Sequence, residues 1–243
     1  MFKCSYEKLK TYKTCPQRYK FSYLDLLGEK FKKPKAEFTM GQHIHTTLRA
    51  LLANIPKTEQ NPKIAKDLLR KYWRTNRTGF KDRANEKSYG ESALQMIDAF
   101  FNTNLIHNPH ALERYVKLTI GRDIEITGRV DRIDVDSAGA AHIIDYKTNN
   151  YSPEWVDFSQ LMIYAYLVLN SLKLPVVSAS FWYLAQNQFV TIFPRTSELD
   201  TVQEEIIFTA KRIMKDDKFL PQESHACSWC EYASICPLKK LST

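Results

Sequence analysis

The stretch GRVDRIDVDSAGAAHIIDYKTNN, residues 128–150, contains two apolar, β-branched runs on either side of a segment of small residues. The runs predict two strands, and DSAGA at 136–140 predicts the hairpin turn between them. Each strand also carries an acid that a plain strand does not need, Asp131 in the first and Asp145 in the second, and Lys147 follows two residues later. The hairpin therefore predicts both the centre of a sheet and a cluster of charge on it.

The predicted register brings these charges together. A turn about Ala138 pairs residues whose numbers add to 276, which places Asp131 opposite Asp145. Because side chains alternate along a strand, Asp145 and Lys147 share one face, and Arg129 joins it opposite Lys147. A shift of one residue would break this geometry. In the predicted register, two carboxylates and an ammonium lie at one end of an otherwise apolar sheet face.

Two opposed carboxylates indicate a cation site. Like charges directly across a strand pair are unfavourable unless something positive lies between them. Lys147 compensates in part, and a hard divalent cation such as Mg²⁺ or Mn²⁺ does so better, with the carbonyl of Tyr146 as a further oxygen ligand. Such a metal would polarise a phosphodiester, while Lys147 would orient a water or stabilise developing charge. The alternative from these residues alone is an Asp–Lys ion pair at a strand end.

The rest of the chain alternates helical and strand patterns. Ser5 is a plausible N-cap of the first helix, and Ser152 with Pro153 predicts the start of another. We expect one α/β domain over 1–243, with a mainly helical, basic region at 1–110, the sheet core that carries the acids at 111–193, and a helix with a cysteine-rich tail at 194–243. Predicted helices span 5–27, 36–55, 61–75, 86–105, 152–172 and 198–215, and predicted strands span 113–121, 123–136, 140–148 and the two arms of a hairpin at 176–194.

Charge is distributed unevenly along the chain. The formal net charge is +8; residues 1–50 hold 11 Lys/Arg against 4 Asp/Glu, and residues 61–83 hold 8 against 2. Residues 111–160 hold 6 Lys/Arg against 9 Asp/Glu. A basic half joined to an acidic centre suits a polyanionic partner such as nucleic acid together with a cation site. The alternative is a solvated basic surface without a specific partner.

The chain start, MFKCSYEKLK, has no apolar region of the kind that a signal peptide needs, and no run approaches the ~20 apolar residues of a membrane span. We therefore expect a soluble protein of a reducing compartment, in the cytoplasm, without a membrane partner.

Five cysteines are present. Cys227, Cys230 and Cys236 form a C-x2-C-x5-C cluster near the C-terminus, Cys15 is distant, and Cys4 remains over. Thiolates at such spacing suit Zn²⁺ or an iron–sulfur cluster, and disulfides are not expected without a secretory signal. Two CxxC pairs would point to zinc, whereas one CxxC with a further cysteine after five residues is less typical of it.

The hairpin resembles that of the PD-(D/E)XK nuclease superfamily, in which an apolar strand with an acid, a turn and a second apolar strand precede D/E-x-K. Asp131 takes the place of the first acid, Asp145 of the second, and Lys147 of the lysine. The resemblance implies a restriction-endonuclease-like core, a mixed β-sheet flanked by helices. It also implies metal-dependent hydrolysis of phosphodiester bonds.

Further motifs resemble the RecB-like branch of this superfamily. In GQHIH, Gly41 precedes His45 by four residues, as in a G-x-x-x-H helix whose histidine can join the metal site; His43 is a rival on another helix face. In QLMIYAY, Gln160 and Tyr164 match a Q-x-x-x-Y motif on the helix after the hairpin. An acid at the start of the preceding strand is also common in these enzymes, and here it is Glu113.

The cysteines resemble the 4Fe-4S staple of RecB-like nucleases, found in AddB-type helicase–nuclease subunits and in CRISPR-associated exonucleases. Their first ligand lies in a segment much like KTCPQRYKFSYLD, and their last is followed by proline, as Cys236 is by Pro237. The implied ligands are Cys15, Cys227, Cys230 and Cys236. The cluster would clip the tail to the first helix, with Zn²⁺ as the alternative metal.

The resemblance implies a DNA exonuclease acting on single strands or ends. Asp131 and Asp145 would hold the metal, with His45, Glu113 and the Tyr146 carbonyl nearby. Gln160 and Tyr164 would position the DNA. Basic residues of the N-terminal helices would contact the DNA phosphates, among them Arg18, Lys20, Lys32 and Lys33.

A catalytically silent or partner-dependent DNA-binding subunit of a DNA-processing complex is the alternative. Loss of an acid or of the lysine would be its signature, and all three are present. No G-x-x-x-x-G-K-[ST] motif occurs, so the chain has no ATP motor of its own. A helicase or another DNA-processing protein is therefore a candidate partner.

Overall fold

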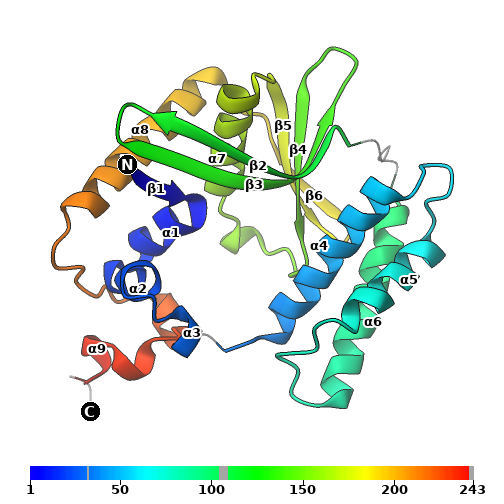
Figure 1. The fold of residues 1–243 in the computed structure, drawn as a ribbon, viewed down its shortest axis with the longest axis horizontal. Coiled ribbons are helices and arrows are strands. Elements are labelled where there is room, and N and C mark those ends of the chain that lie inside the picture. The colour runs from blue at the N-terminus through cyan, green and yellow to red at the C-terminus, as the bar shows by residue number, and fades with distance from the viewer. Residues whose placement is uncertain (32, 104–108, 241–243) are drawn as a thin grey trace. The chain divides into compact units, whose positions relative to one another are not determined.

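The computed structural model describes residues 1–31, 33–103 and 109–240. The chain, which Figure 1 colours by residue number, divides into two compact units. The first unit comprises Met1–Lys33, Lys117–Gly128 and Ser197–Thr243, and the second comprises Pro34–Val116 and Arg129–Thr196. Both are discontinuous because two long strands run from one unit into the other. The prediction of a single domain over 1–243 stays a prediction.

The described strands form one mixed sheet of six strands in the order β1-β3-β4-β5-β6, with β2 paired to β3. The β3–β4 and β5–β6 pairs are antiparallel, whereas β1–β3 and β4–β5 are parallel. The predicted α/β class, a mixed sheet flanked by helices, is therefore confirmed. The strands are β1 Phe2–Ser5, β2 Ala111–Ile120, β3 Ile124–Val135, β4 Ala141–Lys147, β5 Val176–Tyr183 and β6 Gln188–Ile192.

The register of the central hairpin is as predicted. Arg132 pairs with Ile144 and Val135 with Ala141, so the paired residue numbers add to 276. Asp136 forms the turn, because its side chain accepts hydrogen bonds from the backbone N–H groups of residues 138 and 140. This register is what aligns the acidic ends of the two strands.

The apolar core of the second unit lies between three helices and one face of the sheet. Buried side chains of α4, α5 and α6 pack against Ile144, Tyr146 and Trp182, and α7 contacts β4 and β5. Because side chains alternate, Asp145 and Lys147 project from the sheet face opposite Tyr146. The helices of this unit are α4 Ala36–Asn54, α5 Pro62–Trp73, α6 Arg83–Phe101 and α7 Ser159–Leu167, followed by the π-helical turn η3 Val168–Leu172.

Local capping explains where these helices begin. The side chain of Asn61 accepts a hydrogen bond from the N–H of Ile64 and caps the start of α5. The side chain of Asp82 likewise accepts one from the N–H of Asn85. Helix α6 therefore begins at Arg83, three residues before the predicted start at residue 86. The predicted end of that helix, at residue 105, lies outside the described residues.

The prediction of one continuous helix over 152–172 is wrong at its start. Ser152 makes no capping hydrogen bond from its side chain, and Pro153 opens only the 3₁₀ turn η2 (Pro153–Trp155). The chain then becomes extended, and the side chain of Asp157 accepts a hydrogen bond from the N–H of Ser159, where α7 begins. A local Asp–backbone bond of this kind competes with helix continuation.

The first predicted helix, over 5–27, is also divided. Ser5 is the N-cap, as predicted, but α1 (Tyr6–Thr14) ends at Cys15, which is extended. The residue before a proline is disfavoured in the helical region, so Pro16 causes the break. After it come α2 (Pro16–Tyr19) and the π-helical turn η1 (Lys20–Leu24). Strand β1, which the analysis missed, is too short to show an alternating pattern.

The tail of the first unit packs on these N-terminal helices. The ring of Tyr19 stacks on that of Phe219 with centroids 6.1 Å apart, and the hydroxyl of Tyr12 donates to Asp216 Oδ2 at 2.7 Å. Within the described residues, every helix is too short or too polar to cross a lipid bilayer. The remaining elements are α3 Gly28–Phe31, α8 Thr196–Lys215, η4 His225–Trp229, η5 Ala233–Ile235 and α9 Pro237–Lys240.

Replacing Gly79 by Ala should destabilise the second unit. Gly79 has φ +88°, and an added Cβ would lie 2.6 Å from the backbone carbon of Lys35. Gly139→Ala is the matched control, because its φ is +81° but nothing lies within 4 Å of the new Cβ. We expect Gly139→Ala to cost about 1–2 kcal/mol of unfolding free energy from backbone strain, and Gly79→Ala to cost at least ~1 kcal/mol more from overpacking. Urea denaturation measures both, and equal losses would contradict the packing argument.

Candidate active site

The site begins where the pairing of β3 and β4 ends. The paired segment of β3 runs from Arg132 to Val135. One residue before this segment, the side chain of Asp131 replaces the backbone as the partner of β4, because its Oδ2 accepts a hydrogen bond from the backbone N–H of Tyr146 at 2.9 Å. Asp131 is 9% exposed. Its carboxylate is thus fixed at the open end of the hairpin, with one oxygen engaged by β4.

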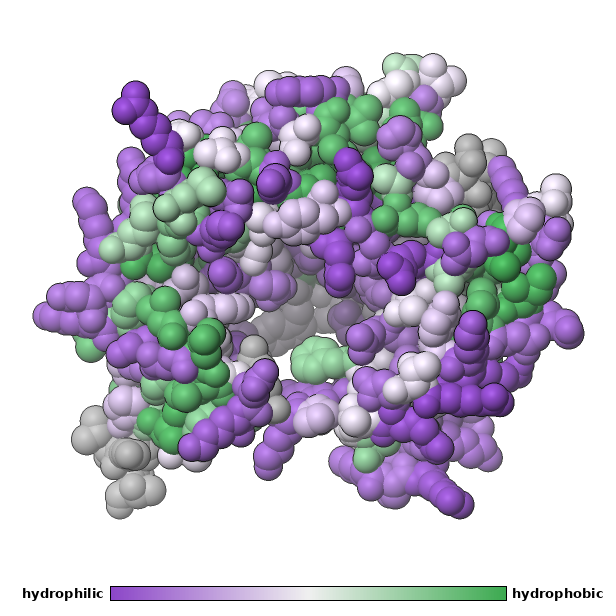
Figure 2. Space-filling model, in the orientation of Figure 1, coloured by the Kyte–Doolittle hydropathy of each residue, from purple (hydrophilic) through white to green (hydrophobic). Residues whose placement is uncertain are grey.

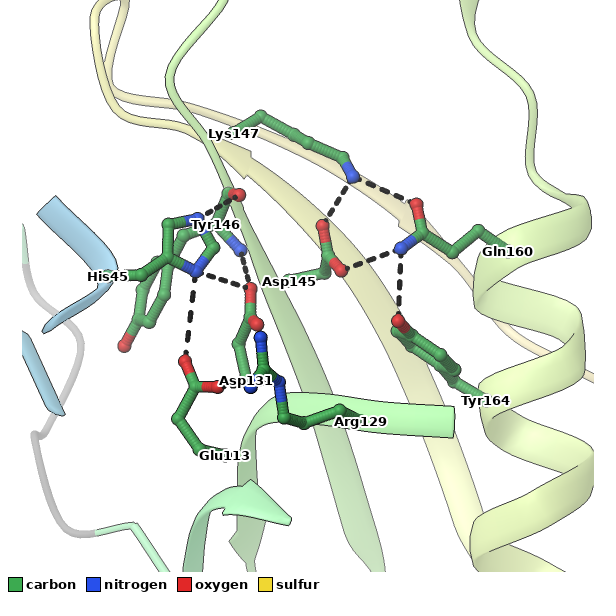
Figure 3. Close-up of polar contacts among 9 residues, drawn as sticks. All are labelled: His45, Glu113, Arg129, Asp131, Asp145, Tyr146, Lys147, Gln160 and Tyr164. Atoms are coloured by element: carbon green, nitrogen blue, oxygen red, sulfur yellow. Dashed lines mark hydrogen bonds and ion pairs between the residues drawn. The ribbon is translucent and has the colours of Figure 1, made fainter. Parts of the chain in front are cut away.

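Asp145 and Lys147 form a closed network with α7. The Lys147 Nζ lies 2.6 Å from Asp145 Oδ2 and donates to Gln160 Oε1 at 2.9 Å. The Gln160 amide nitrogen donates to Asp145 Oδ1 and to the Tyr164 hydroxyl, both at 3.1 Å. Figure 3 shows these four side chains linked by dashed lines, with Gln160 and Tyr164 projecting from α7. Their i, i+4 spacing places them on one helix face.

Burial makes the Asp145 carboxyl less acidic. Burial and the negative charge of Asp131 raise the pKa of Asp145, the positive charge of Lys147 opposes both, and the resulting pKa is about 6. A neighbouring carboxylate can exert this effect only at short range. Asp131 and Asp145 therefore feel each other's charge, as the register predicted.

His45 reaches the same end of the hairpin from α4. Its Nδ1 lies 3.3 Å from Asp131 Oδ2 and 3.8 Å from Glu113 Oε1, and its Nε2 lies 3.1 Å from the carbonyl oxygen of Tyr146. Burial lowers the pKa of His45, but the two carboxylates outweigh it and bring the pKa to about 10. In the metal-free protein, a protonated imidazole therefore supplies the positive charge that the acids need.

Glu113 is held in the site by an unusual backbone conformation. It lies within β2 but has φ +46°, a left-handed conformation that is uncommon for residues other than glycine. Its Oε2 lies 3.0 Å from Arg129 Nε, while Oε1 faces His45. Strained backbone of this kind persists where the surroundings hold it and is frequent at functional sites.

Three of these residues could hold a metal. One ligand atom each from His45, Glu113 and Asp131 lies within 4.8 Å of the others. The Tyr146 carbonyl, which faces His45, offers a further oxygen. Carboxylate and carbonyl oxygens with one imidazole fit Mg²⁺ or Mn²⁺. Asp145 is not in this group, because its carboxylate is turned to Lys147 and Gln160 (Figure 3).

Gly41 brings α4 close enough for His45 to reach the strands. It lies one helical turn before His45, and a Cβ at this position would lie 3.1 Å from the hydroxyl oxygen of Thr148, just beyond β4. The rival histidine lies elsewhere: His43 is buried, its Nε2 lies 2.7 Å from the carbonyl oxygen of Asn76, and its ring packs 5.0 Å from that of Trp73. His45, not His43, thus lies among the acids.

Two contacts of the site were missed by sequence analysis. The Lys147 Nζ lies 4.5 Å from the centre of the Phe181 ring, which stacks on Phe158. Arg129 was expected opposite Lys147 but pairs with Glu113. Phe181 is opposite Asp145 in the parallel β4–β5 register, and a pairing across 36 residues leaves no local pattern.

The four predicted cysteine ligands line one pocket of the first unit. It has a volume of about 590 Å³, and Cys15, Cys227, Cys230 and Cys236 all contribute to its wall, together with Arg18. The tail that carries three of them is tied down by polar contacts. Arg18 lies 3.0 Å from a carboxylate oxygen of Glu231, and the hydroxyls of Ser22 and Tyr232 are 3.0 Å apart.

The basic residues expected to follow DNA phosphates are only partly available for that role. Arg18 is engaged by Glu231, Lys20 and Lys33 lie in the described part of the chain, and Lys32 lies outside it. Their contact with DNA stays a prediction.

The comparisons with known proteins agree with this geometry. The profile of the PD-(D/E)XK nuclease superfamily matches residues 3–237, and the chain therefore belongs to that superfamily. Membership implies metal-dependent hydrolysis of phosphodiester bonds, with DNA as the implied substrate. The fold is accordingly a restriction-endonuclease-like α/β core.

A search of the curated proteins finds no significant match. Among the solved structures similar to this chain is one described as "Crystal structure of SSO0001", with 16% sequence identity and a TM-score of 0.41. The match covers 84% of this chain and 96% of that one. Similarity at this level carries no argument about the site.

His45 should make the stability of the metal-free protein depend on pH. Its folded pKa of about 10 lies above its ordinary value of 6.5, so its contribution is fully present below pH 6.5 and is lost as the pH rises toward 10. Asp145 titrates below this window, with a pKa of about 6. Urea unfolding in EDTA should show wild type losing stability relative to His45→Gln between pH 6.5 and 9.5. A constant difference between the two proteins would contradict the assignment.

Proposed function

We propose that this protein is a metal-dependent DNA exonuclease that hydrolyses phosphodiester bonds of single-stranded DNA or of DNA ends. The observation that carries the proposal is the convergence of Asp131, Asp145 and Lys147 at one end of the β3–β4 hairpin, in a chain of the PD-(D/E)XK superfamily. His45 and Glu113 complete a set of side chains that suits a divalent cation.

The residues that would hold Mg²⁺ or Mn²⁺ are His45, Glu113 and Asp131, with the Tyr146 carbonyl and Asp145 beside them. When bound, such an ion supplies Lewis-acid polarisation of the phosphodiester and makes a water more acidic. His45 would have to be neutral to act as a ligand.

Lys147 is the group that would act on the attacking water. Its Nζ is fixed by Asp145 and Gln160, so the ammonium can donate a hydrogen bond to a water or to a phosphoryl oxygen without first losing side-chain freedom. The Phe181 ring, whose centre lies 4.5 Å from Nζ, attracts the ammonium group through a cation–π contact. Gln160 orients both members of the pair, and Tyr164 orients Gln160. A direct contact of Gln160 and Tyr164 with DNA stays a prediction.

The preference for single strands or ends is proposed from the resemblance to the RecB-like branch. Two motifs behind that resemblance have matching contacts: Gly41 and His45 against β4, and Gln160 and Tyr164 against Asp145. These contacts explain why the residues of each motif occur together. They support the branch without establishing the polarity of cleavage.

The rival is a DNA-binding subunit that is silent or that needs a partner such as a helicase. A silent protein has no need for a buried Asp145 neutralised by Lys147, because burying a carboxylate without function only costs stability. The isolated chain should therefore cleave DNA by itself. Activity that appears only when a second protein is added would support the partner-dependent rival.

Lys147→Ala should lower the rate of cleavage of end-labelled linear single-stranded DNA in Mg²⁺ or Mn²⁺ by about 10³-fold or more, because the attacking water loses its fixed hydrogen-bond donor. Lys63→Ala is the matched control, since this lysine is solvent-exposed and far from the catalytic pair in sequence. Cleavage is compared at a temperature at which circular dichroism shows both proteins to be folded, because Lys147→Ala also leaves the buried Asp145 without its ion-pair partner.

Circular single-stranded DNA tests the exonuclease part. It should stay intact under conditions in which the linear form, labelled at its 5′ or 3′ end, is degraded from a terminus. Cleavage of the circle at a similar rate would show an endonuclease instead.

We further propose that the cysteine pocket holds a 4Fe-4S cluster. Cys15 and Cys227 accept hydrogen bonds from the backbone N–H groups of Gln222 and Ser224, each with a 3.5 Å separation, as bridging and ligand sulfurs of such clusters commonly do. Arg18 Nε is buried without a hydrogen-bond partner among the described residues, and a cluster sulfur would accept a hydrogen bond from it.

Zinc is the alternative metal. Four thiolates can bind one tetrahedral Zn²⁺ or one 4Fe-4S cluster, and metal analysis of the purified protein distinguishes the two. Since the thiolates must stay reduced, the proposal includes a cytoplasmic location.

Cys15→Ser should remove most of a broad absorption near ~400 nm from anaerobically purified protein, and iron and acid-labile sulfide should fall with it. Cys4→Ala is the matched control: Cys4 is 1% exposed, its thiol faces the Glu125 carbonyl, and burial raises its pKa to about 12. We expect Cys4→Ala to contain as much iron as wild type. Neither wild type nor Cys4→Ala should contain stoichiometric zinc. Zinc without iron in wild type would end the cluster proposal.

A further inference from the structure

A second candidate binding site lies on the helices α5 and α6. Between them is an open groove of about 620 Å³, and its floor is apolar, formed by Leu69, Trp73 and Leu94. Trp73 is held firmly, because its ring stacks on Phe80 with centroids 5.5 Å apart and its indole N–H donates to Glu86 at 3.0 Å. The groove lies wholly within the second unit, on the side of α4 that carries His43.

Basic side chains form the rim of this groove. Five of them, against two carboxylates, contribute to its wall, and Figure 2 shows hydrophilic side chains covering α5 and α6. Four of these basic residues belong to the eight Lys/Arg residues that the sequence has between residues 61 and 83. The basic residues are Arg70, Arg74, Arg77, Arg83 and Lys87, and the acidic ones are Glu86 and Glu91.

Not all of this charge is used within the protein. Arg77 is paired with Glu86, and Arg70 with Asp67 at 2.8 Å. Arg74 and Arg83 are exposed, and no hydrogen bond or ion pair to either guanidinium group is present among the described residues. Arg74 follows the last residue of α5, and Arg83 is the first residue of α6. Two guanidinium groups of the rim thus remain available for an anion.

Gly90 keeps the groove open. It lies in the middle of α6, where glycine costs about 1 kcal/mol relative to alanine. Packing does not require it, because an added Cβ would meet Trp73 only at 3.9 Å, an ordinary contact distance. Its effect is to leave the edge of the Trp73 ring at Cζ2 without a side chain from position 90 against it.

We propose that this groove binds a segment of single-stranded nucleic acid, with phosphates on the arginine rim and a base over the apolar floor. The planar guanidinium group matches phosphate oxygens in pairs, and an aromatic floor accepts any base. The two carboxylates of the groove are paired with its own basic residues, Glu86 with Arg77 and Glu91 with Lys87, which leaves Arg74 and Arg83 for phosphates. The inference rests on the proposed function in one respect, that the substrate of the site on the same unit is DNA.

Binding without cleavage tests the groove separately from the chemistry. In a Lys147→Ala background, fluorescence anisotropy with a labelled oligothymidine gives Kd at several salt concentrations. Arg74→Ala with Arg83→Ala should raise Kd about 10-fold near 0.1 M salt. The slope of log K against log salt should become less steep by about 1.4, since each lost contact to a single strand contributes ~0.7. Arg49→Ala with Lys63→Ala, which removes two exposed basic residues that do not line the groove, is the charge-matched control and should change neither quantity.

A neutral variant separates occlusion from charge. Gly90→Leu should fill the groove beside the Cζ2 edge of Trp73 and raise Kd several-fold with an unchanged salt slope, and Gly90→Ala should have a clearly smaller effect. With Lys147 intact, the groove variants should raise KM of cleavage and leave kcat unchanged. Unaltered Kd in the double arginine variant and in Gly90→Leu would overturn the proposal, and the groove would then suit an acidic peptide. A different result would count against the proposed function alone. In that case the groove variants bind the oligonucleotide more weakly, but the protein with Lys147 intact does not cleave DNA.

Discussion

The site depends on the point at which β3 and β4 stop pairing. Up to Arg132 the two strands bond through their backbones, and at Asp131 a side-chain carboxylate accepts the next N–H, that of Tyr146. This bond fixes an acid at the mouth of the hairpin and holds the Tyr146 carbonyl where His45 can face it. If the backbone pairing of β3 and β4 continued past Arg132, the Asp131 side chain would be free to turn to solvent. The hydrogen bond from the Tyr146 N–H to Asp131 therefore fixes the positions of the groups around this carboxylate.

The electrostatics of the site follow from this placement. Three carboxylates in partly buried positions need positive charge, and the protein supplies it separately to each: His45 to Asp131, Arg129 to Glu113 and Lys147 to Asp145. Each pair is satisfied locally, which is why the metal-free arrangement is stable. A divalent cation near Asp131 would compete with protonated His45, and the family to which the chain belongs implies that such a cation is bound. Metal binding should therefore release a proton from the imidazole.

In the second unit, different sides of helix α4 face the two candidate sites. One side of α4 carries His45 to the strands, with Gly41 allowing the close approach, while another side presents His43 to Trp73 and the loop before α6. A single helix thus supports both the catalytic cluster and the floor of the α5–α6 groove. The first unit is built on a different principle, since a break at Cys15 and Pro16 places a thiol beside a tail that contributes three more.

By itself the sequence determined the features that are encoded locally. The alternating runs and the small-residue turn gave the β3–β4 hairpin its register, and the i, i+4 spacing of Gln160 and Tyr164 placed both on one helix face. Proline effects were harder to anticipate, because whether Pro16 begins a helix or divides one depends on what the flanking segments pack against. Only the tertiary structure decided that Asp145 turns to Lys147 rather than to Asp131, that Arg129 pairs with Glu113, and that Phe181 lies under Lys147. These contacts join segments far apart in the chain, and their geometry depends on sheet order and side-chain packing, which no short sequence pattern records.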